Sequence, residues 1–173
     1  MEKIKIAKAE YNLVIDCAKR IIAKKEQFNV KSQKYFPKRN EIDTHIFGML
    51  GELGIAKYLD IKYEPEVFIG GDGGIDLVKG NYYIQVKTRN KVGYDFALKS
   101  DTMTEFTADI GILAYVEPAT LKGEFDGLEV ILGGWTTQRH MKRHMYKVNF
   151  GYGDRLSIKQ EKLLPMKNIW EVL

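Results

Sequence analysis

Residues 75–89 read IDLVKGNYYIQVKTR, two runs rich in isoleucine, valine and tyrosine on either side of Gly80-Asn81. Glycine next to asparagine is typical of a tight turn, and β-branched and aromatic residues favour paired strands. The stretch therefore predicts a β-hairpin. Alternation along a strand puts Gln85 and Lys87 on one face, and pairing across the turn can bring Asp76 beside them.

Two helices are expected before the hairpin. Residues 7–27 repeat apolar side chains at helical spacing, with basic side chains elsewhere on the surface. Residues 28–40 are polar and basic and contain a proline, which indicates a loop or arm. A second amphipathic helix is predicted through residues 45–60, capped by Asp43 or Thr44.

The rest of the chain predicts a mixed sheet within a single domain. Further elements are expected as follows: a short strand at residues 67–69, a glycine-rich turn at 70–74, buried strands at 110–116 and 128–135, a basic helix at 136–145 and a strand near 146–150. The order of helices and strands suits an α/β fold with a central mixed sheet flanked by helices. Residues 1–173 are expected to form one domain, with a basic N-terminal helix and arm at residues 1–40.

Composition narrows the class of protein. The formal net charge of +4 and sequence pI of about 9.0 lean toward polyanionic partners but do not decide the matter. Cys17 is the single cysteine, so the sequence excludes an internal disulfide and favours a reducing, cytoplasmic location. The N-terminus is too polar for a secretory signal, and no apolar run approaches the roughly 20 residues needed to span a bilayer.

The hairpin and the second helix carry residues suited to phosphodiester hydrolysis. This reaction needs a hard cation to offset charge on the phosphate, oxygen ligands to hold it, and a group near the attacking water. Asp76 offers a carboxylate, Gln85 an amide oxygen and Val86 its main-chain carbonyl. Lys87 supplies an ammonium that can position water or neutralise the transition state. Glu52 would add a second carboxylate from the helix.

Three segments taken together resemble the PD-(D/E)XK nuclease superfamily. They are Gly48–Glu52 (GMLGE) on a helix, Gly74–Asp76 (GID), and Gln85–Lys87 (QVK) on the next strand. The resemblance spans residues 44–89 and implies a restriction-endonuclease-like fold, a central mixed sheet with helices on both sides. It also implies a Mg²⁺ site, in which Mn²⁺ would substitute, and hydrolysis of DNA that leaves a 5′-phosphate.

Two positions depart from the motif of that superfamily. Ile75 stands in place of its proline, which is not a ligand. Gln85 stands in place of its acid, and this removes one negative charge and should lower cation affinity. Similar QxK versions occur in Mrr-like nucleases and related enzymes such as Holliday junction resolvase-like nucleases, so Gln85 favours that branch. The alternative is a catalytically inactive DNA-binding module, or a partner subunit of another nuclease, with the same fold.

Basic side chains outside the motif are expected to contact DNA. Arg89 and Lys91 follow Lys87 closely enough to touch the strand being cut. The other candidates lie in the predicted basic helix and in the arm: Arg139, Lys142, Arg143, Lys34, Lys38 and Arg39. A solvated surface is the alternative for both segments. A homodimer would suit a double-strand cut, because one site cuts one strand.

Two other patterns are not interpreted as sites. The glycine-rich stretch 70–74 lacks the Gly-Lys-Ser/Thr ending of a phosphate loop, so no nucleotide cofactor is expected. His140 and His144 lie one helical turn apart, but no third metal ligand accompanies them.

Overall fold

A computed structural model describes residues 1–30, 40–65, 74–99, 108–117, 127–151 and 153–173. The elements are β1 (Lys3–Lys5), α1 (Lys8–Gln27), α2 (Glu41–Tyr58), β2 (Leu77–Lys79), β3 (Tyr82–Arg89), β4 (Phe96–Lys99), β5 (Ile110–Tyr115), β6 (Glu129–Thr137), α3 (Gln138–His144), β7 (Tyr146–Asn149), β8 (Asp154–Ile158) and two 3₁₀ helices, η3 (Gln160–Lys162) and η4 (Met166–Glu171). The fold is mixed α/β, as predicted.

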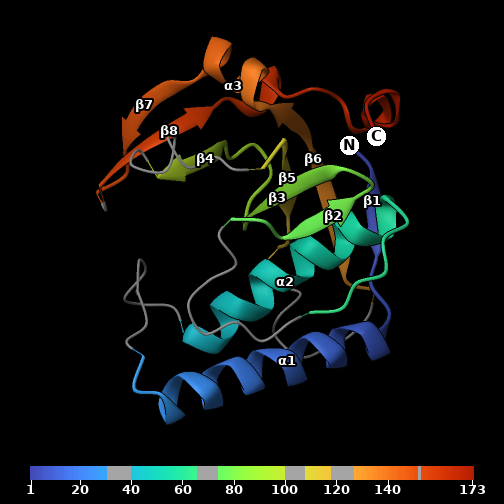
Figure 1. Cartoon of the computed structure of the whole chain (residues 1–173), viewed down its shortest axis with the longest axis vertical. Coiled ribbons are helices and arrows are strands. Elements are labelled where there is room, and N and C mark those ends of the chain that lie inside the picture. Colours follow the sequence, from blue (N-terminus) through green and yellow to red (C-terminus); the bar gives the residue numbers. More distant parts are fainter. Residues whose placement is uncertain (31–39, 66–73, 100–107, 118–126, 152) are drawn as a thin grey trace.

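The larger sheet has the strand order β1-β6-β5-β3-β2. Strands β3 and β5 run parallel, and every other neighbouring pair is antiparallel. All six residues of β5 are buried, which explains its continuous apolar sequence. In Figure 1, α2 lies between this sheet and α1, and the three-stranded sheet β4-β8-β7 covers the opposite face. The five-stranded sheet is therefore the middle layer of the molecule.

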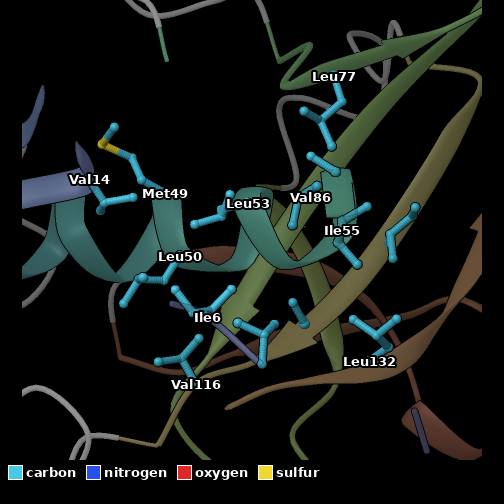
Figure 2. Close-up of a cluster of buried hydrophobic side chains, with 14 of the residues drawn as sticks. Ile6, Val14, Met49, Leu50, Leu53, Ile55, Leu77, Val86, Val116 and Leu132 are labelled. Atoms are coloured by element: carbon cyan, nitrogen blue, oxygen red, sulfur yellow. The ribbon is translucent and has the colours of Figure 1, made fainter. Parts of the chain in front are cut away.

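Helix α2 is buried because it packs on the sheet with one side and on α1 with the other. Figure 2 shows Leu50, Leu53 and Ile55 of this helix against strand residues that include Val86 and Leu132. Two helix glycines allow the close approach. A Cβ atom on Gly51 would overlap the side chain of Thr88, and one on Gly54 would lie 2.6 Å from Val130.

The helix boundaries differ from the predictions at their N-terminal ends. α2 begins at Glu41, and the side chain of Asn40 accepts a hydrogen bond from the Ile42 amide at 3.4 Å, so the predicted caps Asp43 and Thr44 are wrong. Asp43 instead lies in the first turn, where its charge favours the positive end of the helix dipole. α3 begins at Gln138, capped by Thr137, because β6 continues two residues beyond its predicted end.

Three strands were not predicted, and three predicted features cannot be compared. β1, β4 and β8 are short or polar, and each is defined by its pairing partner. The features that cannot be compared are the expected strand at 67–69, the expected glycine-rich turn at 70–74 except its last residue, and the basic arm residues Lys34, Lys38 and Arg39, which lie outside the described residues. Among the residues that are described, no helix has the length and hydropathy needed to cross a membrane.

The contact between Gly51 and Thr88 predicts opposite effects for two alanine substitutions in α2. Gly51→Ala would drive a methyl group into a strand side chain and lower the free energy of unfolding by about 1–3 kcal/mol. Gly48→Ala is the matched control, because its Cβ meets only Glu52 Oε1 at 3.9 Å. It should be neutral or stabilising by up to about 1 kcal/mol, as alanine favours helix. Urea denaturation followed by circular dichroism measures both, and equal stability of the two variants would contradict the packing described.

Candidate active site

The side chain of Asp76 forms a hydrogen bond with β3 beyond the point where the main-chain pairing of β2 ends. Strand β2 begins at Leu77, and the Asp76 amide still donates to the Ile84 carbonyl at 2.9 Å. Two residues further along β3, the Val86 amide donates to Asp76 Oδ2 at 2.6 Å. The carboxylate thus takes the place of a main-chain carbonyl. This contact fixes Asp76 against β3 between Gln85 and Lys87.

The main chain of β3 points its alternate residues to opposite edges. The carbonyls of Tyr83 and Arg89 accept from the β5 side, at 2.8 Å from the Asp109 amide and 2.9 Å from the Val116 amide. Val86 is an odd number of residues away from Tyr83 and Arg89, so its main-chain groups point to the opposite edge. Its amide donates to Asp76 there. Because the N–H and C=O of one strand residue point the same way, the Val86 carbonyl is also directed to the edge that holds Asp76.

Glu52 reaches this region from α2. The neighbouring Gly51 lies against Thr88, and the Thr88 hydroxyl donates to the Gly48 carbonyl at 3.4 Å. This contact holds the middle of α2 against β3. The carboxylate of Glu52 accepts a hydrogen bond at Oε2 from the hydroxyl of Tyr63, at 2.9 Å.

Tyr63 is a residue of this site that the sequence did not reveal. Burial raises the pKa of its hydroxyl, and the nearby charges of Glu52 and Asp76 raise this pKa further. The phenol thus contacts the carboxylate of Glu52 directly, and the charge of Asp76 acts on it from the residue before β2. A single tyrosine among polar residues after a helix gave no pattern from which to predict this.

Gln85 and Lys87 occupy the other face of β3. Ile84 and Val86 belong to the main core beneath α2, so alternation directs Gln85 and Lys87 away from that helix. Both are half-buried. Asp76 lies at the edge of the sheet, where the two faces meet. The structure thus places Glu52 and Tyr63 on the α2 side of β3 and Gln85 and Lys87 on the other, with Asp76 at the edge between the two faces.

The oxygen donors at this edge are of the kind that bind Mg²⁺. They are the carboxylates of Asp76 and Glu52 and the main-chain carbonyl of Val86, and hard oxygen atoms suit this cation. The described part of the chain holds no cluster of three or more histidine, cysteine, aspartate or glutamate side chains suited to a metal. The expected ligand set has two side chains of these types, Glu52 and Asp76, so it falls below that number.

The predicted DNA-contacting residues lie in different environments. The guanidinium of Arg89 donates to the carbonyls of Asp95 at 3.1 Å and Ala97 at 3.2 Å, and burial lowers its pKa. Arg89 therefore ties β3 to the segment that leads into β4. Lys91 is exposed. Three further predicted residues are exposed on α3: Arg139, Lys142 and Arg143.

No protein-family model, curated protein or solved structure matches this chain.

The hydrogen bond between Asp76 and Val86 predicts that two substitutions of the aspartate differ in stability. Asp76→Ala removes the acceptor of a partly buried amide and should lower the free energy of unfolding by about 1–3 kcal/mol. Asp76→Asn keeps an acceptor oxygen and should lose markedly less. Chemical denaturation of both variants tests this expectation. Equal losses would mean that the carboxylate is not the partner that matters for the fold of the hairpin.

Arg89 and Lys91 are expected to separate in the same measurement. Arg89→Ala removes two hydrogen bonds to main-chain carbonyls and should cost about 1–3 kcal/mol of stability. Lys91→Ala alters an exposed side chain and should change stability by less than about 0.5 kcal/mol. Thermal unfolding compares the two directly. If Arg89→Ala were as stable as the wild type, the hydrogen bonds of Arg89 would not matter for the fold, and the arginine would again be a candidate for DNA contact.

Proposed function

We propose that this protein is a Mg²⁺-dependent deoxyribonuclease of the PD-(D/E)XK class, with Glu52, Asp76, Gln85 and Lys87 as its active site. The observation that carries the proposal is the hydrogen bond from Val86 to Asp76, which fixes the hairpin carboxylate against the QVK strand. The close packing of Gly51 on Thr88 supports it, because it brings the helix bearing Glu52 to the same strand. In this proposal the fold is a restriction-endonuclease-like one.

Each residue of the site has a separate task in the proposed reaction. Asp76, Glu52 and the Val86 carbonyl would hold the cation, which offsets charge on the scissile phosphate and polarises water when it is bound. Gln85 completes the ligand set or orients water. Lys87 positions the nucleophile or stabilises the negative charge that builds on the phosphate. The phosphodiester is hydrolysed to a 5′-phosphate and a 3′-hydroxyl.

DNA is the proposed substrate because the molecule exposes several cations in addition to the candidate ligands. Lys91 lies two residues beyond β3, and α3 exposes Arg139, Lys142 and Arg143. Such side chains neutralise phosphates without reading sequence, which suits a nuclease with weak or structure-dependent specificity. Two copies acting together would account for a cut in both strands.

Cleavage of a panel of plasmid, linear, single-stranded and branched DNA with Mg²⁺ or Mn²⁺ tests the proposal. Wild-type protein should cut at least one substrate, and EDTA should abolish the cutting. Asp76→Asn and Lys87→Ala should each slow cleavage by at least about 100-fold, as expected for loss of a group that acts on the transition state. Asp76→Asn is used because it keeps the hydrogen-bond acceptor for Val86.

Lys3→Ala is the matched control for Lys87→Ala. Lys3 is an exposed lysine on β1, at the opposite edge of the same sheet, where it pairs with Glu129 at 2.8 Å. Its variant should cut DNA at the wild-type rate. If DNA is bound but never cut, the protein is an inactive DNA-binding module and not a nuclease. DNA that is neither bound nor cut would contradict both.

A further inference from the structure

The segment that carries Tyr63 is fixed on both sides. On one side, the Ile61 amide donates to the Ala56 carbonyl at 2.8 Å and continues the end of α2. On the other side, the thiol of Cys17 in α1 contacts the Pro65 carbonyl at 3.6 Å. Between these two contacts the ring of Tyr63 packs against the main core. The position of the phenol is therefore set by two helices and not by a free loop.

The hydroxyl of Tyr63 donates to Glu52 Oε2 at 2.9 Å. A hydrogen bond to an ionised acceptor is roughly twice as strong as one between neutral groups. Tyr63 is thus a hydrogen-bond donor to the carboxylate of Glu52.

A donor to Glu52 matters here because the proposed site brings two like charges, those of Glu52 and Asp76, to the same strand. Two carboxylates brought together repel each other, and this repulsion favours conformations in which one turns away. A glutamate on a helix also has several rotamers, and only some of them point to the strand. A fixed neutral donor offsets the repulsion and selects among the rotamers at the same time.

We propose that Tyr63 is a positioning residue that holds the carboxylate of Glu52 beside Asp76, so that both can bind one hard divalent cation. This inference rests on the proposed function and adds to it a residue outside the four motif positions. Groups that hydrogen-bond to a metal ligand set its orientation, and their loss typically lowers metal affinity about 10- to 100-fold. Tyr63 acts through Glu52 and does not touch the substrate.

The test is Tyr63→Phe in the full chain, with Tyr115→Phe as matched control. Tyr115 is also a buried tyrosine whose hydroxyl donates to a carbonyl, that of Tyr94 at 2.8 Å, but it belongs to the second core cluster. Burial raises its pKa to about 12. Each variant loses one phenolic hydrogen bond. Mn²⁺ affinity, measured by electron paramagnetic resonance, should fall about 10- to 100-fold in Tyr63→Phe only.

The Mg²⁺ concentration that gives half-maximal DNA cleavage should rise by the same factor in Tyr63→Phe and stay unchanged in Tyr115→Phe. If Tyr63→Phe is less stable, the increase in Tm on adding Mn²⁺ still reports binding, because only the shift is compared. A variant with wild-type affinity and wild-type metal dependence would overturn the inference.

A double-mutant cycle separates positioning from a general structural role. In the Glu52→Gln background, adding Tyr63→Phe should change Mn²⁺ affinity by less than about twofold, because residues that act as a unit are not additive. A full additional loss in that background would overturn the inference and leave the proposed function intact. A wild-type protein that neither binds Mn²⁺ nor cuts DNA would instead overturn the proposed function, and this inference with it.

Discussion

The close packing of α2 on β3 and β6 sets the position of most of the molecule. A helix normally packs at a distance fixed by its side chains, but Gly51 and Gly54 bring the backbone of α2 directly onto Thr88 and Val130. Since β3 pairs with both β2 and β5, this one contact sets the helix relative to the hairpin and the buried centre of the sheet. α1 then packs on the outer side of α2, where its residues Val14 and Cys17 are buried.

The same contact links stability to the candidate chemistry. Glu52 follows Gly51 in sequence. The other motif positions are Asp76 and the strand residues Gln85 and Lys87, which come just before Thr88. The fold therefore brings the segments that carry Glu52 and Asp76 to one strand through packing that would be needed in any case to bury α2, while Gln85 and Lys87 project from the opposite face of that strand. A proposed cation site at this position needs no separate scaffold, only side chains with suitable oxygen atoms.

Sequence reasoning found the parts of the fold that have strong local patterns. The periodic helix at residues 7–27, the hairpin turn at Gly80 and the buried strand β5 all follow from spacing or turn chemistry, and the structure confirms them. β4 and β8 were not found because short strands of mixed polarity are defined by their partners, which lie far away in sequence.

The candidate site was also predictable only where the pattern is local. The motif positions could be selected from order and spacing, but the hydrogen bond from Val86 to Asp76 and the approach of Tyr63 to Glu52 join distant segments. Arg89 shows that local sequence can suggest a different environment from the one in the structure. It follows the motif as a surface cation would, yet its guanidinium binds two carbonyls near β4, a strand that was not predicted.

The side chain of Asp76 also bears on the pairing capacity of β3 beyond the end of β2. β2 is the outermost strand of its sheet in the described structure and has three residues, whereas β3 has eight. Beyond Leu77 the amides of β3 would offer a template to which a strand from another molecule could add. The Asp76 carboxylate occupies the Val86 amide and places a negative charge on that edge. The residue proposed to bind a cation thus also occupies an amide of β3 to which a further strand could otherwise pair.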